Sequence, residues 1–313
     1  GWCRGTFHEE NSYPMTSTAF MSRRIVLADF NLDENLDVLI SGTHYPTIPG
    51  GQHGLLLYLG DGDGSFTDIS WLVPDDEDMD GYGLAACDID GDGDLDIIQS
   101  GRGEPFSGAP PAQIPHVIMN LYTPGYALEF SALDPSTSGF QPIFRGNDIS
   151  CADLDDDSKP DLIAIALQDN VGNSLYENNT TELSGVEFLD VSNRLPDLTS
   201  GQDGFDYIHQ RESTQSIPIC RLEDSPDEAT LFYGNGNINN RLFQANAVMR
   251  FDETAHAYSV NESLGFGFDK SLDLTAKIIC SDLDGNGLTD TVFVANHGKS
   301  YLYRYRGNQG GAQ

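Results

Sequence analysis

Aspartates recur at closely spaced positions in this sequence, and residues 87–98 form the densest stretch, CDIDGDGDLDII. From Asp88 onward, carboxylates stand at positions 1, 3, 5, 7 and 9 of a nine-residue segment. Oxygen ligands at alternate positions around a tight turn suit a hard cation, because Ca²⁺ takes about six to eight oxygens at roughly 2.3–2.6 Å. Carboxylates this close repel one another and raise one another's pKa unless a positive charge lies among them. The stretch therefore predicts a calcium-binding loop.

The same spacing of oxygen side chains occurs four times, and we number the segments by their order in the chain. Loop 1 comprises residues 29–37, loop 2 residues 88–96, loop 3 residues 153–161 and loop 5 residues 282–290. A degenerate loop 4, residues 221–229, has Arg221 at position 1 and Ala229 at position 9. The five segments begin 59, 65, 68 and 61 residues apart. A repeat period above about 50 residues indicates a propeller-type array.

The predicted ligands are the side chains at positions 1, 3, 5 and 9 and the backbone carbonyl at position 7, and together they would hold about four structural Ca²⁺ ions. Glycine at position 6 permits the sharp turn in loops 2 and 5, whereas Glu34 and Ser158 stand there in loops 1 and 3. In loop 4 we expect the Arg221 guanidinium to replace the ion beside Glu223 and Asp224. The predicted metal-binding residues are Asp29, Asn31, Asp33, Asn35, Asp37, Asp88, Asp90, Asp92, Asp94, Asp96, Asp153, Asp155, Asp157, Lys159, Asp161, Asp282, Asp284, Asn286, Leu288 and Asp290.

The acidic loops allow other interpretations. An EF-hand needs Glu at position 12 and flanking helices, but position 12 here is Ile40, Gln99, Ala164 or Phe293, and the flanks resemble strands. Magnesium is disfavoured because it keeps several of its water ligands. An acidic turn without an ion remains the alternative for any one loop, and four copies at the same place in a repeat favour the metal.

The loops must be positioned by short strands. Each period contains four short segments that are rich in β-branched and aromatic residues and bounded by Gly, Asn, Asp or Pro, which predicts four strands. A second marker, a Phe at residues 7, 66, 130, 188 and 251, repeats at intervals of 59, 64, 58 and 63. The last repeat stops after three strands. We therefore expect residues 5–9 to supply its fourth strand and close the ring, which leaves no long strand edge unpaired.

The predicted fold is an all-β, five-bladed β-propeller of four-stranded antiparallel blades, because four such strands per repeat form a propeller blade. A single domain, residues 1–313, is expected. The approximate blades are residues 12–72, 73–135, 136–193, 194–257 and 258–313, the last completed by the closing strand at residues 5–9.

These motifs resemble the FG-GAP/VCBS repeat of integrin-alpha-like calcium-binding β-propellers. The resemblance rests on the Asp-x-Asp-x-Asp-Gly-x-x-Asp pattern with its following strand at residues 88–98, on the Leu-Tyr pairs at 57–58, 175–176 and 302–303, and on the five Phe markers. It covers nearly the whole chain and implies a propeller with calcium loops. It implies no single function, because similar propellers occur in integrin heads, fungal lectins, polysaccharide lyases and bacterial surface proteins.

Charge and hydropathy restrict the partners and the location. The net charge is −33, with only 16 Lys and Arg in 313 residues. Nucleic acid is therefore an unsuitable partner, because phosphate binding requires clustered basic residues. No apolar run reaches the roughly 20 residues that cross a bilayer, so no membrane span is expected. Calcium loops of weak affinity match extracellular calcium, which favours a secreted or cell-surface protein.

Four of the five cysteines share one place in the repeat. Cys87, Cys151, Cys220 and Cys280 fall on the first strand of their blades, near the ring axis, where we expect free, packed thiols. Cys3 lies outside the repeat and is a candidate for a covalent or assembly contact with another chain.

The loops on the face opposite the acidic loops are long, which is typical of functional loops. Their aromatic residues Tyr45, Trp71, Tyr82, Phe106 and Tyr207 are candidates for stacking on a sugar or anchoring a protein, although each could instead pack beneath its loop.

The sequence offers little evidence for catalysis, because no HExxH or GxSxG motif occurs. We expect a non-catalytic, calcium-stabilised extracellular propeller that binds a glycan or protein partner in adhesion, recognition or surface assembly. The alternative is a carbohydrate-active enzyme of the polysaccharide lyase or sugar dehydratase type that uses this loop-rich face.

Overall fold

The structure is a computed structural model in which almost every ordered element is a β-strand. Short 3₁₀ turns, η2 (Ser70–Leu72) and η3 (Ser192–Arg194), are the helical elements of the described residues. The structure describes residues 20–44, 54–74, 81–101, 113–143, 146–153, 159–167, 173–181, 185–196, 214–222, 225–235, 247–252, 254–260, 275–296 and 300–304.

Five antiparallel sheets follow one another along the chain, and we number them as blades. Blade 1 consists of β1 (Phe20–Ala28), β2 (Asp37–His44), β3 (Leu55–Gly60) and β4 (Phe66–Asp68). Blade 2 consists of β5 (Gly81–Cys87), β6 (Asp96–Gly101), β7 (His116–Asn120) and β8 (Phe130–Ala132). Blade 3 consists of β9 (Gly146–Ala152), β10 (Leu162–Leu167), β11 (Ser174–Asn178) and β12 (Phe188–Asp190).

The last two blades vary this plan. Blade 4 consists of β13 (Thr214–Ser216), β14 (Ile219–Leu222), β15 (Ser225–Asn235), β16 (Ala247–Asp252) and β17 (Ala257–Val260). Its inner strand is split into β13 and β14, and both halves pair with β15. Pro218 lies in the break, where its missing N–H removes a ladder hydrogen bond. Blade 5 shows three strands among the described residues, β18 (Thr275–Ser281), β19 (Thr291–Asn296) and β20 (Tyr301–Arg304).

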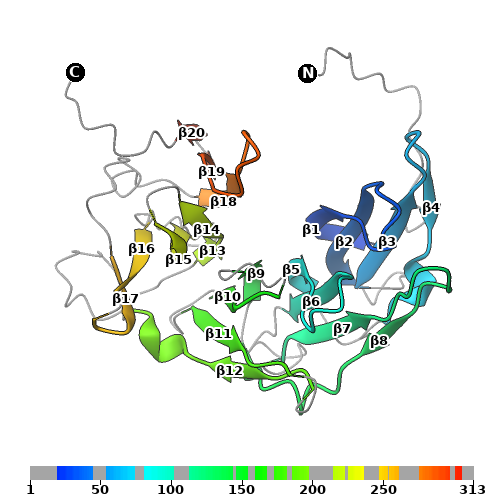
Figure 1. The fold of residues 1–313 in the computed structure, drawn as a ribbon, viewed down its shortest axis with the longest axis horizontal. Helices are drawn as coiled ribbons and strands as arrows, with labels where there is room; N and C mark the ends of the chain where they lie inside the picture. The colour runs from blue at the N-terminus through cyan, green and yellow to red at the C-terminus, as the bar shows by residue number, and fades with distance from the viewer. Residues whose placement is uncertain are drawn as a thin grey trace.

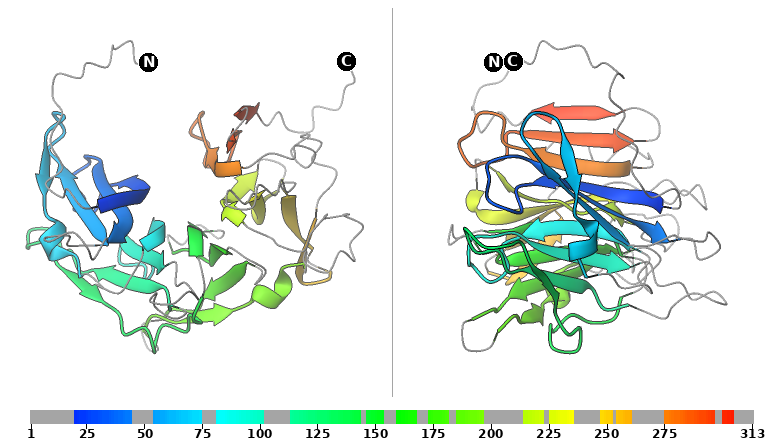
Figure 2. Two further views of the ribbon diagram at one scale, coloured as in Figure 1. Left: turned by 180° about the vertical axis from the view of Figure 1, so that it is seen from behind. Right: turned by 90° about the vertical axis from the view of Figure 1, so that its right-hand side faces the viewer.

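The blades stand in sequence order around a common axis, which confirms the predicted propeller arrangement of five antiparallel blades (Figure 1). The first strand of each blade is innermost, and β4, β8, β12 and β17 lie on the outer rim. The side view in Figure 2 shows that the strands run along the short axis of the disc. Successive strands run in opposite directions, so loops 1, 2 and 5, which follow inner strands, lie at one end of this short axis.

The hydrophobic core is divided into layers between adjacent blades. Ile97 and Ile98 of β6 are both fully buried, although consecutive residues of a strand face opposite sides. Ile97 packs in the layer shared with blade 1, and Ile98 packs in the layer shared with blade 3. Further layers lie between blades 3 and 4 and between blades 4 and 5. A blade buried on both faces needs apolar residues at successive positions, which explains runs such as the Leu162–Leu167 strand LIAIAL.

A buried carboxylate near the axis ties four blades together. Asp148 on β9 has a side chain that is 2% exposed. The Nζ of Lys277, on β18, lies 2.7 Å from both carboxylate oxygens. The Nε of Arg24, on β1, donates to Oδ1 at 3.2 Å, and the hydroxyl of Ser216, on β13, donates to Oδ2 at 2.8 Å. Arg24 also donates to the backbone carbonyls of Asn147 and Gln215, so blades 1, 3, 4 and 5 meet at this carboxylate.

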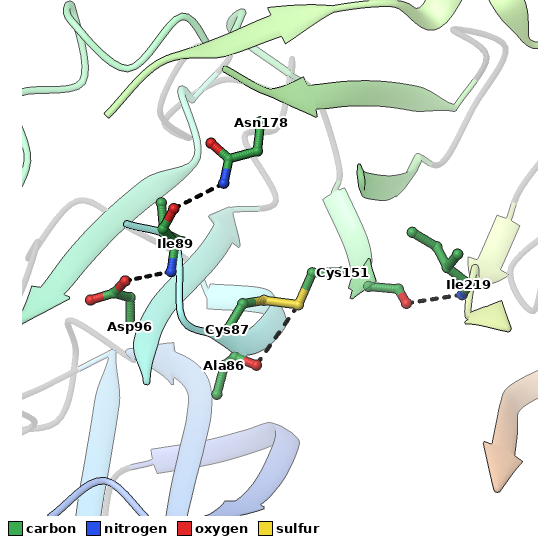
Figure 3. Close-up of a disulfide and its surroundings, with 8 residues drawn as sticks. Ala86, Cys87, Ile89, Asp96, Cys151, Asn178 and Ile219 are labelled. Atoms are coloured by element: carbon green, nitrogen blue, oxygen red, sulfur yellow. Dashed lines mark hydrogen bonds between the residues drawn. A yellow bond between two sulfur atoms is a disulfide. The ribbon is translucent and has the colours of Figure 1, made fainter. Parts of the chain in front are cut away.

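Disulfides join the inner strands of neighbouring blades, and the expectation of free thiols was wrong. Cys87 of blade 2 is bonded to Cys151 of blade 3, as Figure 3 shows, and Cys220 of blade 4 is bonded to Cys280 of blade 5. The paired residues are separated by 64 and 60 positions, which is about one repeat. Because cysteines at the same place in adjacent blades face each other across the layer between them, they lie close enough to bond.

Blade 4 departs from the predicted pattern in two further respects. Phe251 lies in the third strand, β16, whereas Phe66, Phe130 and Phe188 begin the fourth strands of blades 1 to 3. Tyr258 of β17 fills that place in blade 4 and packs in the core layer with blade 3. Loop 4 is not a nine-residue loop either, because β15 begins at Ser225 and Leu222 already pairs with it.

The predicted closing strand at residues 5–9 lies outside the described residues, and so does Cys3. Ring closure by the N-terminal segment therefore stays a prediction. The described part of the chain contains no helix that is long and apolar enough to cross a membrane.

We expect Asp148→Asn to lower the free energy of unfolding by about 2 kcal/mol, because it leaves the Lys277 and Arg24 cations together without a counter-charge. Both cations are partly exposed, at 38% and 24%, so water reduces the effect below that of a fully buried pair. Urea denaturation followed by tryptophan fluorescence measures it. Adding Lys277→Met should restore part of the loss, and an unchanged midpoint in Asp148→Asn would contradict the assigned role.

Candidate metal centres

Loops 1, 2 and 5 share one hydrogen-bond pattern, which shows that their sequences build the same turn. The Oδ1 of the position-1 aspartate accepts a hydrogen bond from the position-5 amide at 3.1 Å in loops 1 and 2 and at 3.3 Å in loop 5. Its Oδ2 accepts from the position-6 amide at 2.7–2.9 Å in all three. The position-5 side chain accepts from the position-7 amide. The oxygen side chains are thus held around one centre by the loop's own backbone.

The aspartate at position 9 fastens each turn to its blade. Oδ2 of Asp37, Asp96 and Asp290 accepts a hydrogen bond from the position-2 amide at 2.8, 2.8 and 3.0 Å. In blades 1 and 2 the other oxygen accepts from the end of the third strand, at the amides of Gly60 and Asn120. Asp37 and Asp96 are fully buried. One carboxylate therefore connects the loop, the second strand and the third strand.

Positions 4 and 6 of these turns adopt left-handed backbone conformations. Gly91 and Gly93 have φ of 79° and 97°, and the glycines of loop 5 are similar. In loop 1 the same places are filled by Leu32 and Glu34, with φ of 55° and 69°. A side chain at such φ costs roughly 1–2 kcal/mol, which glycine avoids. Loop 1 therefore keeps the turn despite strain, as expected if its oxygen ligands need that geometry.

Carboxylates converge in two of the loops. Oxygen atoms of Asp88, Asp90 and Asp96 all lie within 4.8 Å of one another, and Asp282, Asp284 and Asp290 form the same arrangement in loop 5. Position 7 of loop 2 adds a further feature. Asp94 is 1% exposed, and neither of its carboxylate oxygens has a hydrogen-bond partner. Burial raises the pKa of Asp94 and the nearby Tyr122 amide offsets part of that rise, but the hydrogen bond of this amide, at 3.2 Å, goes to the Asn120 side chain. A buried carboxylate without donors is unstable as an anion unless a cation lies beside it.

Burial and mutual repulsion disturb the acidity of loop 2. Burial raises the pKa of Asp94 to about 7 and that of Asp96 to about 8, and neighbouring carboxylates add to both shifts. The pKa values of Asp88 and Asp90 are also raised, again mainly by burial. In loop 5 the Thr291 hydroxyl lowers the pKa of Asp290, and the Gly287 amide lowers that of Asp282. Among the described loops, loop 2 is therefore the one in which an added cation would most reduce the unfavourable burial and mutual repulsion of the carboxylates.

The other predicted ligands are placed less completely. In loop 3 the structure describes Asp153, Lys159 and Asp161, whereas Asp155 and Asp157 lie outside the described residues. Arg221 lies in β14, where its carbonyl accepts a hydrogen bond from Thr289 of loop 5. The suggestion that its guanidinium replaces an ion stays a prediction, because Glu223 and Asp224 are outside the described residues.

Of the candidate ligand-binding aromatics, Trp71 and Tyr82 fall within the described residues, and Tyr45, Phe106 and Tyr207 do not. Trp71 lies on η2 and is 74% exposed, as a stacking platform requires. Tyr82, on β5, is half-buried. The Arg23 guanidinium lies 4.2 Å from its ring centre and donates a hydrogen bond to its hydroxyl. Tyr82 therefore already has a cation stacked on it.

Comparison with known families identifies the repeat. The model of the FG-GAP-like repeat matches residues 29–98, from the first residue of loop 1 to the strand that follows loop 2. Residues 29–98 therefore carry the FG-GAP-like repeat, within a chain that folds as a five-bladed β-propeller. The match to this family and the five antiparallel blades confirm the predicted family and fold, and the family match covers the two loops whose hydrogen bonds are described most fully.

The other comparisons add little to this match. No curated protein sequence matches the chain. A solved structure of a protein provisionally assigned as an exo-β-1,3-galactanase from Bifidobacterium bifidum s17 is 12% identical, with a TM-score of 0.45. The similarity covers 87% of this chain and 80% of that chain. At this score the likeness supports no conclusion about activity.

We expect Glu34→Gly to be more stable than Glu34→Ala by about 1 kcal/mol in the free energy of unfolding. Both variants remove the same charge, and glycine alone removes the left-handed strain, partly offset by its larger unfolded-state entropy. Chemical denaturation in a calcium-free buffer compares the two. Equal stability would show that loop 1 does not hold this backbone conformation in solution.

Without divalent ions, the free energy of unfolding should decrease as pH rises from about 4 to 8. The folded-state pKa values of Asp94 and Asp96, about 7 and about 8, lie above the ordinary value of 3.8. Their contribution is therefore present at low pH and is lost as pH rises through the folded-state values. The carboxyls with lowered pKa values act in the opposite direction, but near and below pH 4. Unfolding free energies measured in EDTA should fall across this range, and a flat or rising profile would contradict the assigned burial.

Proposed function

We propose that this FG-GAP propeller is a non-catalytic, calcium-stabilised protein that works outside the cell and binds a glycan or protein partner on its loop-rich face. The observation that carries the calcium part is Asp94, whose two carboxylate oxygens are buried and lack donors beside three converging carboxylates. A bound Ca²⁺ would supply the missing positive charge and coordinate several of these oxygens at once.

The donor set of loop 2 suits calcium in its chemistry as well as its charge. All five side chains at the alternate positions are carboxylates, and no nitrogen or sulfur ligand belongs to the loop. Hard cations prefer oxygen donors, whereas zinc and copper sites use imidazole or thiolate. Asp88 and Asp90 would hold the ion from the start of the turn and Asp96 from its end. Loop 5 offers a similar set with an amide, Asn286, at position 5.

The ions would act mainly on stability. Four Ca²⁺ would reduce the net charge from −33 to −25 and would bind the folded loops far better than the unfolded chain. Ligand binding of this kind adds to the free energy of folding by mass action. The gain in folding free energy should be largest in blade 2, because the carboxyls of its loop have the most strongly raised pKa values.

The disulfides support the extracellular location. Two inter-blade bonds, Cys87–Cys151 and Cys220–Cys280, join inner strands. Such bonds persist in oxidising compartments and are rare in reducing ones. Calcium loops also match the millimolar calcium outside cells, because extracellular modules bind it with dissociation constants of about 10⁻⁴–10⁻³ M.

The partner-binding part rests on the exposed Trp71, which lies in the connection between blades 1 and 2 on the face opposite the acidic loops. A flat exposed indole is a common platform for sugar rings and an anchor for proteins. Glycan-array binding by the full chain, with Trp71→Ala as the matched variant, tests this. Loss of binding in the variant is expected. Turnover of a bound oligosaccharide would replace the binding function with the enzyme alternative.

We expect Asp94→Asn to have opposite effects with and without calcium. In EDTA it should raise the melting temperature, because a buried, unpartnered charge is removed. In millimolar Ca²⁺ it should reduce the calcium-induced gain in melting temperature, because a buried negative charge beside the ion is lost. Differential scanning calorimetry measures both effects, with Glu129→Gln, an exposed carboxylate outside the acidic loops, as the control for charge. The calcium assignment fails if Ca²⁺ stabilises neither the wild-type chain nor the control.

A further inference from the structure

A lysine of loop 3 lies across loop 2, although the two loops belong to different blades. Lys159 occupies position 7 of loop 3, where loop 2 has Asp94. A methyl group built at Gly91 of loop 2 would lie 2.7 Å from Cδ, 2.8 Å from Cγ and 3.4 Å from Cε of Lys159. The aliphatic stem therefore packs directly on the backbone at Gly91. The absence of a side chain at this position leaves the space that the lysine uses.

Blade 3 contacts loop 2 at a second point. The side-chain amide of Asn178, at the end of β11, donates a hydrogen bond to the carbonyl of Ile89 at 2.9 Å (Figure 3). An equivalent contact joins blade 2 to loop 1, where the Asn120 amide donates to the carbonyl of Phe30 at 2.8 Å. The amide contact thus repeats from blade to blade. The lysine stem is an additional contact at loop 2, and in loop 5 nothing would lie within 4 Å of a methyl group built at Gly285 or Gly287.

This arrangement places a positive charge where the chain concentrates negative charge. Gly91 lies between Asp90 and Asp92, and five carboxylates belong to the same loop. A stem that crosses Gly91 leads the Lys159 ammonium to the border of this group, because only one bond separates it from Cε. Lysine side chains commonly pack their methylenes on a surface while the charged end stays hydrated. The whole chain has only 16 basic residues, so such a placement matters for the local charge.

We propose that Lys159 is a built-in counter-charge of loop 2 that sets the calcium affinity of that loop. The proposal rests on the proposed calcium binding and adds a residue that controls it. Without calcium, the ammonium offsets part of the repulsion among the carboxylates. With calcium bound, the same ammonium repels the ion. Lys159 therefore stabilises the empty loop and weakens the filled one, which keeps its dissociation constant in a range where calcium can leave.

The test is a calcium titration of the full chain by isothermal calorimetry, together with melting temperatures in EDTA. Lys159→Met keeps the stem and removes the charge. It should tighten the loop 2 site about fivefold, as expected for one charge several ångströms from a divalent ion in a hydrated, screened setting. It should also lower the melting temperature in EDTA. Lys159→Arg, which keeps the charge, should resemble the wild type in both measurements.

Two controls assign the effect to loop 2. Arg194→Met removes one positive charge elsewhere in blade 3, where Arg194 is paired with Glu177, and should leave the calcium titration unchanged. In a background that carries Asp90→Asn and Asp92→Asn, loop 2 is disabled, so Lys159→Met should no longer change calcium affinity. A residue with a merely structural role would weaken stability and calcium binding together, and the charge-retaining variant would not rescue both.

The outcomes separate the inference from the calcium proposal. Tighter binding and lower stability in Lys159→Met, both absent in the disabled background, support the inference. Unchanged or weaker calcium affinity in Lys159→Met overturns it while calcium binding by the wild type stands. A shift that persists in the disabled background also overturns it, because the lysine then acts elsewhere. If Asp90→Asn with Asp92→Asn leaves the wild-type titration unaltered, loop 2 binds no calcium and the inference fails, whereas calcium binding by the other loops fails only if the wild-type chain shows no calcium binding at all.

Discussion

The blades depend on the hydrogen bonds of the aspartate that ends each acidic loop, which is buried in loops 1, 2 and 5. Asp37 and Asp96 accept hydrogen bonds from the second residue of their loop and from the end of the third strand. A carboxylate is expensive to bury, and backbone N–H donors compensate only part of that expense. The buried carboxylate therefore still needs a positive charge nearby, which a cation bound in the surrounding loop would supply. Fold and ion binding are therefore linked in this propeller, because the residue that fixes the hairpin also belongs to the acidic cluster.

The blades depend on one another as much as on their own hydrogen bonds. Each is apolar on both faces, so a blade without neighbours would expose the side chains that form the core layers. Contacts that cross from blade to blade add specific connections to this packing. Asn120 and Asn178 reach the preceding loop, the disulfides join inner strands, and Asp148 gathers cations from blades 1 and 5. The proposed role of Lys159 is another such contact, because a lysine of blade 3 would place its positive charge beside the carboxylates of blade 2.

The repeat in the sequence was sufficient to predict the family, the number of blades and the shape of loops 1, 2 and 5. These features follow from local chemistry, since alternate oxygens, glycines at left-handed positions and short β-rich segments act within a few residues. Blade 4 was predicted less well, because Tyr258 replaces the expected Phe and Pro218 splits the inner strand. Because Leu222 already pairs with Ser225, the predicted nine-residue loop 4 does not form.

Interactions between distant residues were missed for a different reason. Arg24, Asp148 and Lys277 lie 124 and 129 positions apart along the chain and form no motif. The disulfides did have a signal, because the spacings of 64 and 60 equal one repeat, but the general tendency of buried cysteines to be free thiols was given more weight. Repeat spacing converts directly into spatial proximity in a propeller, so it was the better guide. The partner of Trp71 has no comparable signal, because an exposed indole fits many ligands.

The central claim is that the converging carboxylates of loops 2 and 5 coordinate calcium. Diffraction from crystals grown in calcium, collected at a long wavelength where calcium scatters anomalously, tests it most directly. The account predicts anomalous peaks in both loops, each within about 2.3–2.6 Å of aspartate oxygens, with Asp94 drawn into the arrangement of loop 2. Ordered loops with no anomalous peak, and with a lysine or water among the carboxylates, would contradict it.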